Sequence, residues 1–177
     1  MKKYLFAALA FASLAFAGCD NPGGIVEKED YKFENSHMLF NFNIGGELAK
    51  FIEVEGVTTL PASQGKATFS SDGTKHSMFI SNIDCPAEFD IIFTLSPKSG
   101  LSVESSTKYN YTASYDYVVT RNFDDGSHIE GSKDQSDEMT GTVVGKNIEN
   151  FFNIYKTNKF SFKITVDGFV DTDDDAE

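Results

Sequence analysis

The sequence predicts an all-β protein, folded as an antiparallel sandwich or a closed barrel of roughly nine or ten strands. Two observations carry this prediction. Apolar and polar side chains alternate along most of the chain after residue 37, with the two-residue period of half-buried strands. Turn-forming glycine, proline, asparagine and aspartate residues recur about every 8–12 residues between these segments. Alternation, in place of continuous apolar runs, favours antiparallel strands with one face toward solvent.

The first strand is expected to begin at Met38, because the even-numbered residues from there to Ile44 are all apolar. Gly45-Gly46 follows and predicts a tight hairpin turn, since glycine adopts the positive φ angles that such turns require. The return strand is then expected over residues 48–54. Further strands are expected over residues 67–69, 76–80, 89–95, 108–121, 127–131, 139–145 and 159–167.

Turn signals separate these later strands. Asp72-Gly73 predicts a second hairpin, residues 97–100 close the strand that precedes them, and residues 124–126 (Asp-Asp-Gly) predict a third turn. Only residues 146–153 have a pattern compatible with a short helix.

Charge and composition exclude several classes of protein. The 177 residues include 27 acidic and 15 basic ones, a net charge of −12, so the surface repels nucleic acids and anionic lipids. Hydrophobic residues make up 40% of the chain and aromatic residues 14%, which is too apolar for a wholly disordered protein. After residue 18 no apolar run approaches the roughly 20 residues of a membrane-spanning helix.

The N-terminus has the pattern of an export signal. Lys2 and Lys3 precede an apolar stretch over residues 4–16, and Phe16-Ala17-Gly18-Cys19 comes next. This tetrapeptide resembles the lipobox of bacterial envelope lipoproteins. The resemblance implies that residues 1–18 form a lipoprotein signal peptide and that Cys19 is lipidated, so that its lipid anchors the chain to a membrane. The expected location is the bacterial cell envelope, at the outer membrane.

A competing interpretation is cleavage at Ala15-Phe16-Ala17 by the ordinary signal peptidase, which would leave Cys19 near a free N-terminus. In either case the mature chain loses Lys2 and Lys3. It then has 13 basic and 27 acidic residues and a net charge of −14.

The expected domain organisation has three parts after the signal. Residues 19–36 form a polar tether, although the alternation of Tyr31 and Phe33 would also suit an early strand. Residues 37–170 form a single β domain. Residues 171–177 form an acidic tail that is expected to be disordered.

Motifs for catalysis or metal binding are not apparent. The chain has no G-x-S-x-G, no H-E-x-x-H and no pair of closely spaced cysteines. The scattered histidines (His37, His76 and His128) do not have zinc-ligand spacing, and Cys85 is expected to be a small buried hydrophobe. The acidic segment over residues 134–138 is expected to be a solvated loop. We therefore expect no enzyme activity, no cofactor and no metal.

The most informative pattern is a row of four tyrosines on one face of residues 108–121: Tyr109, Tyr111, Tyr115 and Tyr117. Three interpretations stay open. The tyrosines face the core, or they line a partly wet cavity that holds a small ligand, or they form an exposed platform for sugar rings or an aromatic partner. These four residues are the candidate ligand-binding residues.

The sequence thus predicts a non-catalytic, lipid-anchored envelope protein that acts in recognition or assembly, with a protein or a glycan as its partner. The alternative is a lipocalin-like carrier of a small apolar ligand in a tyrosine-lined cavity. A carrier requires a hollow interior of several hundred Å³, roughly, whereas a recognition module requires a filled core and an exposed patch.

Overall fold

The computed structural model describes residues 32–133 and 138–171. These residues form ten strands, two 3₁₀ turns and one short helix. In chain order they are β1 (Phe33–Gly45), η1 (Ala49–Phe51), β2 (Ile52–Thr58), β3 (Lys66–Asp72), β4 (Lys75–Ile83), β5 (Ala87–Pro97), β6 (Lys108–Phe123), β7 (His128–Lys133), β8 (Met139–Val144), η2 (Gly145–Asn147), α1 (Ile148–Tyr155), β9 (Thr157–Ile164) and β10 (Phe169–Asp171).

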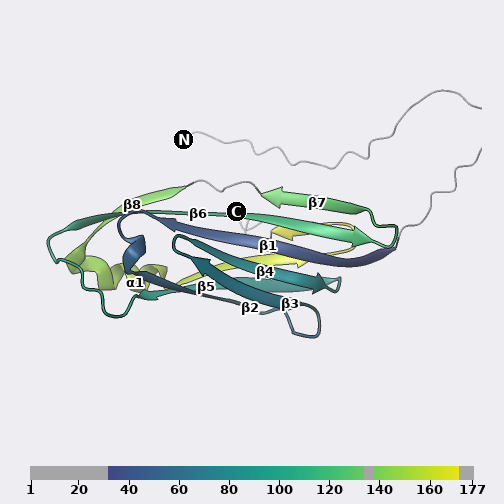
Figure 1. Ribbon diagram of the computed structural model, residues 1–177, viewed down its shortest axis with the longest axis horizontal. Helices are drawn as coiled ribbons and strands as arrows, with labels where there is room; N and C mark the ends of the chain where they lie inside the picture. Colours follow the sequence, from purple (N-terminus) through teal and green to yellow (C-terminus); the bar gives the residue numbers. More distant parts are fainter. Residues whose placement is uncertain (1–31, 134–137, 172–177) are drawn as a thin grey trace, which may run out of the picture. The chain divides into compact units, whose positions relative to one another are not determined.

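The strands form two antiparallel sheets that pack face to face (Figure 1). In the six-stranded sheet the order is β3-β4-β1-β6-β7, and β8 also pairs with β6, beyond the end of β7. The four-stranded sheet has the order β10-β9-β5-β2. The all-β prediction is confirmed. Since the described strands stay in two separate sheets, the sandwich version of that prediction fits and the closed barrel does not.

The core between the sheets is rich in aromatic rings. Phe40, which is fully buried in β1, stacks on Tyr115 and Tyr117 of the neighbouring strand, with centroid distances of 5.6 and 6.0 Å. Its ring also contacts Phe93 at 5.7 Å and Phe160 at 4.6 Å, both in the opposite sheet. Full burial of such a side chain stabilises the fold by about 1.5–3 kcal/mol, so this cluster holds the two layers together.

The predicted hairpin at Gly45-Gly46 is wrong. Gly46 has a positive φ of 83°, but β2 pairs with β5 in the other sheet and not with β1. The reason is Leu48, which is completely buried and whose N–H donates to the carbonyl of Asn110 at 3.0 Å. Burial of Leu48 directs the chain across the end of the sandwich.

Other predicted turns and elements are confirmed. Asp72-Gly73 joins β3 to β4 and residues 124–126 join β6 to β7, with Gly73 and Gly126 at φ values of 61° and 81°. The short helix predicted near residues 146–153 is α1, preceded by η2. No helix in the described part of the chain combines the length and hydropathy that a membrane span needs.

The described domain begins slightly earlier than expected. β1 starts at Phe33, so residues 33–36 of the expected tether belong to the sheet, as the alternation at Phe33 allowed. The Phe33 ring packs edge-on against Phe123 at 6.3 Å, and Ser36 is fully buried. These contacts explain why a polar-looking segment joins the fold.

Candidate functional site

The tyrosine row of β6 faces the space between the sheets. Tyr109 and Tyr117 are buried, whereas Tyr111 and Tyr115 are partly buried against the core. Each ring packs edge-on or tilted against another aromatic ring: Tyr109 against Phe51 at 5.2 Å, Tyr111 against Phe151 at 5.1 Å, Tyr115 against Phe160 at 4.8 Å and Tyr117 against Phe162 at 5.2 Å. The row is therefore part of the hydrophobic core, which is the first of the three interpretations.

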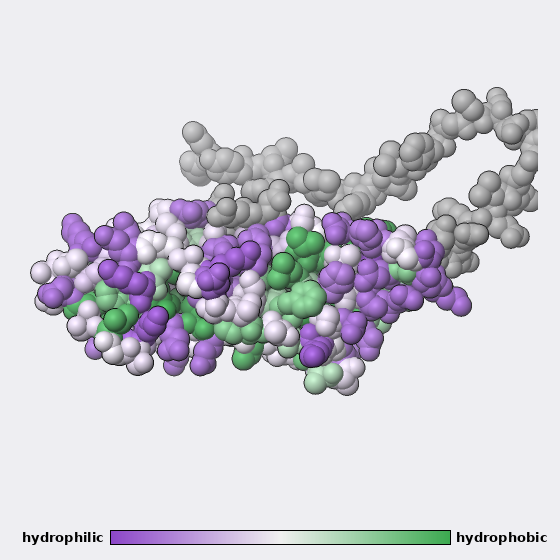
Figure 2. All heavy atoms as spheres, in the orientation of Figure 1, coloured by the Kyte–Doolittle hydropathy of each residue, from purple (hydrophilic) through white to green (hydrophobic). Residues whose placement is uncertain are grey.

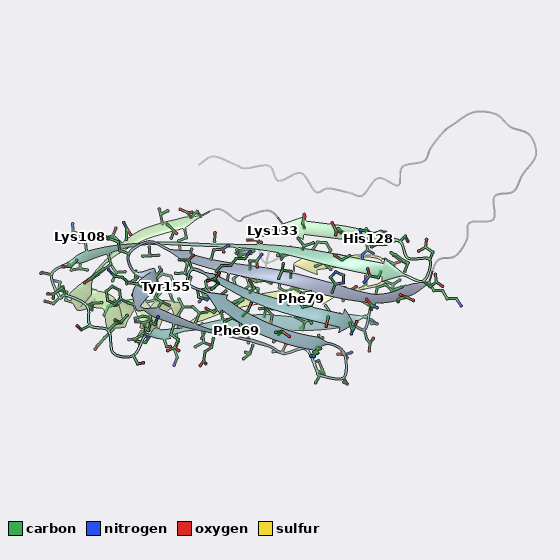
Figure 3. The ribbon with its side chains drawn as sticks, viewed as in Figure 1. Phe69, Phe79, Lys108, His128, Lys133 and Tyr155 are labelled. Atoms are coloured by element: carbon green, nitrogen blue, oxygen red, sulfur yellow. The ribbon has the colours of Figure 1, made fainter. Side chains whose placement is uncertain are left out.

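The hydroxyl groups of this row have partners at the rim of the core. The hydroxyl of Tyr109 accepts a hydrogen bond from the N–H of Glu104 at 2.9 Å. The ammonium of Lys133 donates to the hydroxyl of Tyr115 at 2.9 Å and lies 5.0 Å from the centre of the same ring (Lys133 is labelled in Figure 3). These partners explain why tyrosine is found where phenylalanine would fill the same volume.

Tyr111 packs against α1 and lines a small cavity there. Burial, and then a hydrogen bond with Tyr155, raise the pKa of the Tyr111 hydroxyl, so it stays protonated in the neutral range. The cavity at this place has a volume of about 20 Å³ and is lined by Phe42, Leu95 and Phe151 among others. This volume holds about one water molecule.

The opposite, outward face of the same sheet has a different character. Phe79 of β4, Leu39 of β1 and Val118 of β6 lie side by side in one register row. They are 42%, 37% and 37% exposed, which is high for large apolar residues near the middle of a sheet. Figure 2 shows hydrophobic residues gathered over the region of β1 and β4, where Figure 3 labels Phe79. We call these three residues the apolar row.

A hydrogen-bonded polar cluster adjoins the apolar row. Ser77 and Asp116 flank Asn41 in the next register row of the same face. The hydroxyl of Ser77 donates to Oδ1 of Asn41 at 2.8 Å, and Nδ2 of Asn41 donates to Oδ1 of Asp116. Nδ2 of Asn43 donates to Oδ2 of Asp116 at 3.2 Å. We call these four residues the polar cluster, and the apolar row and polar cluster together the outer platform.

Sequence reasoning missed the outer platform, although a signal for it exists. Each member of the apolar row is the middle residue of three consecutive apolar residues, as in Met38-Leu39-Phe40 and Met78-Phe79-Ile80. In an alternating strand, the middle residue of such a run points away from the core. Only the strand register shows that these residues are neighbours.

A second polar site lies on the outward face of the four-stranded sheet. A shallow depression of about 360 Å³ is lined by residues that include Thr59, Glu88 and Asp90. The carboxylate of Asp90 accepts from Ser161 at 2.8 Å and pairs with Lys159 at 3.2 Å. The N–H of Asp90 donates to the Thr59 hydroxyl at 2.7 Å. Because Asp90 of β5 contacts both β9 and Thr59, the residue that follows β2, we interpret the cluster as a structural tie between these segments.

The histidine and cysteine side chains, which are the remaining candidates for metal binding or reactivity, do not lie together. His76 is buried between the sheets with its Nδ1 2.9 Å from the Ser71 hydroxyl, and burial lowers its pKa. Burial also raises the pKa of the Cys85 thiol, whose Sγ lies 3.8 Å from the hydroxyl of Ser36. Within residues 32–133 and 138–171, no group of His, Cys, Asp and Glu side chains could hold a metal ion. Cys19, residues 134–137 of the acidic segment and residues 172–177 of the expected tail lie outside the described residues, whereas Asp171, the first residue of that tail, belongs to β10.

Comparison of the chain with protein-family models, with curated proteins and with solved structures gives no match. The candidate site therefore rests on its geometry.

Proposed function

We propose that this protein is a non-catalytic recognition or assembly module of the bacterial cell envelope, anchored by a lipid on Cys19. Its partner contacts the outer platform. The observation that carries this proposal is the apolar row of Phe79, Leu39 and Val118, exposed in register across three strands and bordered by the polar cluster. An apolar centre with a polar border is the usual anatomy of a binding surface.

The interior of the sandwich supports recognition over transport. A carrier for a small apolar ligand needs a cavity of roughly 300–1,000 Å³. The space beside Tyr111 has a volume of about 20 Å³, and the tyrosine rings are packed against phenylalanines of the opposite sheet and of α1. Between the described strands, the tyrosine row thus fills the space in which a carrier would hold its ligand.

The chemistry of the platform also favours binding over catalysis. Asp116 is the acidic group of the polar cluster, and among the described residues it accepts hydrogen bonds from the neutral amides of Asn41 and Asn43. General acid–base catalysis needs a positioned group whose pKa suits proton transfer, commonly with a second such group. A carboxylate held by two amides is better suited to accepting hydrogen bonds from a ligand.

The anchor is tested separately from the platform. Palmitate labelling of cells that express the full chain should be lost in Cys19→Ala, and that variant should leave the membrane fraction. If Cys19→Ala keeps both its label and its membrane partitioning, the lipid-anchor part of the proposal fails.

The platform is tested with the full chain carrying Cys19→Ala, which removes the lipid as a cause of sedimentation. This protein should sediment with isolated envelope material, and Leu39→Glu should abolish that binding by placing a charge in the apolar row. Val57→Glu is the matched control, because Val57 is 57% exposed on β2, outside the platform. Equal binding by the two glutamate variants would refute the platform as the contact surface. Thermal unfolding checks that both variants remain folded.

A further inference from the structure

We propose that the ligand of the outer platform is a neutral, hydroxyl-rich glycan chain. This inference rests on the proposed function, since it names the chemical class of the partner that the same surface binds. It is carried by three properties of the platform: the unused hydrogen-bonding capacity of its polar cluster, the exposed ring beside that cluster, and its charge.

The polar cluster has capacity for further hydrogen bonds. A carboxylate has about four acceptor positions and a side-chain amide has two donor hydrogens. Among the described residues, Asp116 accepts one bond at each oxygen and Asn43 donates one, and both side chains are partly exposed, whereas Asn41 is buried. Acceptors therefore lie next to donors. A pair of neighbouring sugar hydroxyls matches this arrangement, because each hydroxyl donates one hydrogen bond and accepts others.

The aromatic ring of Phe79 supplies a stacking surface beside these polar groups. The face of an aromatic ring is electron-rich and attracts polarised C–H bonds, which line the flat sides of a pyranose ring. Phe79 and Ser77 lie on the same face of β4, two residues apart, which separates them by about 7 Å along the strand. A sugar chain lying over β4, β1 and β6 can therefore stack on Phe79 while its hydroxyls reach Ser77 and Asp116, which are partly exposed.

The charge of the protein selects against acidic glycans. The chain has a net charge of −12, and the charged group of the polar cluster is itself a carboxylate. The net charge of the chain disfavours uronic acids, sulfated sugars and phosphate-containing polymers, and the cation opposite Asn43 on this face is the single ammonium of Lys75. Neutral sugars pay no such electrostatic cost.

The size of the apolar row argues against a protein partner. A stable protein–protein interface takes about 20–30 residues from each side, with a buried apolar centre. The apolar row consists of three side chains, each about two-fifths exposed. A sugar chain needs only one or two stacking contacts together with hydrogen bonds, so the observed surface fits it better.

The test is affinity electrophoresis of the full chain, in detergent, through native gels that contain one soluble polysaccharide each. Dextran, mannan, laminarin and galactan are the neutral probes, and polygalacturonate is the acidic one. We expect at least one neutral probe, and not polygalacturonate, to retard the protein. Phe79→Ala and Asn43→Ala should each weaken the retardation about tenfold, the loss expected for a residue central to binding. Val57→Ala should behave as the unchanged protein does.

The other outcomes overturn the glycan inference, its restriction to neutral glycans, or the proposed function. Retardation that is equal in Phe79→Ala and Val57→Ala would place glycan binding elsewhere and refute the inference. Retardation by polygalacturonate alone would refute the neutral class. No retardation by any neutral probe, with envelope binding still sensitive to Leu39→Glu, would overturn the glycan inference and leave the proposed function standing. If no neutral probe retards the protein and Leu39→Glu leaves envelope binding unchanged, both the glycan inference and the proposed function are wrong.

Discussion

The ring of Tyr111 lies directly over Gly141 on the neighbouring strand. The two residues are opposite one another in the register of β6 and β8. A Cβ atom added at Gly141 would lie 2.5 Å from both Cζ and the hydroxyl oxygen of Tyr111, closer than real Cβ atoms approach. Since the same ring packs against Phe151 and Tyr155, it cannot move aside without disturbing the contact with α1.

This relationship predicts that Gly141→Ala destabilises the fold. The expected loss is about 1–3 kcal/mol, the usual effect of overpacking a filled site. Urea unfolding measures it, and Gly168→Ala is the control, because a Cβ added at Gly168 meets nothing within 4 Å. Equal unfolding midpoints for the two variants would show that the Tyr111 ring is free to shift.

Tyr117 is predicted to contribute strongly to stability through its packing. Its buried ring contacts Phe162 at 5.2 Å and Phe169 at 5.9 Å, so Tyr117→Ala should cost about 3–5 kcal/mol by leaving a cavity. Tyr115→Phe keeps a similar ring and removes the hydroxyl that accepts from Lys133, so its cost should be about 0.5–1.5 kcal/mol. Chemical denaturation of the two variants side by side checks the ranking, and similar losses would contradict it.

His76 is predicted to make stability depend on pH. Burial lowers its pKa in the folded protein, so below about pH 6.5 the unfolded chain binds a proton that the folded chain does not. The free energy of unfolding should therefore fall as the pH decreases from about 6.5 toward the lowered pKa, and should be constant with respect to His76 above that range.

Denaturant unfolding of the full chain at a series of pH values measures this slope. His76→Gln removes the titrating group while keeping a polar side chain near Ser71, and it should flatten the profile in that window. A slope that persists unchanged in His76→Gln would assign the pH dependence to other groups.

Cys85 is predicted to be a slowly reacting thiol. Burial raises its pKa, the effect that outweighs the lowering by the hydrogen bond with Ser36, and the thiolate is the reactive form. In Cys19→Ala it is the only cysteine of the chain. Alkylation by iodoacetamide at pH 7.5, roughly one unit below an ordinary cysteine pKa, should be at least about tenfold slower than in urea. Equal rates in the two conditions would show an exposed thiol.

Much of the fold could be predicted because each strand carries its own signal. The alternation around Phe40 and along residues 108–121, and the glycine turns at Gly73 and Gly126, are local properties of the sequence. The hairpin at Gly45-Gly46 could not be judged in this way. Its outcome depends on the burial of Leu48 beneath a segment that lies about sixty residues further along the chain.

The candidate site was less predictable than the fold. The tyrosine row was visible because its members share one strand, and the structure places them in the core. The members of the apolar row lie on three strands, and Leu39 meets Phe79 and Val118 only through pairings across 40 and 79 residues. A single outward-facing apolar residue is common on protein surfaces. The platform can therefore be recognised only from the strand register, which shows that these residues are neighbours.

The place of β1 in its sheet determines how the domain responds to mechanical load. Any force on the chain before Phe33 enters through β1, which is hydrogen-bonded to β4 on one side and to β6 on the other. Because antiparallel hydrogen bonds run perpendicular to the strands, a pull along β1 loads many of them together, in shear. Attachment through the three-residue edge strand β10 would instead break its bonds one after another. A force that enters before Phe33 is therefore shared between two neighbouring strands from the start.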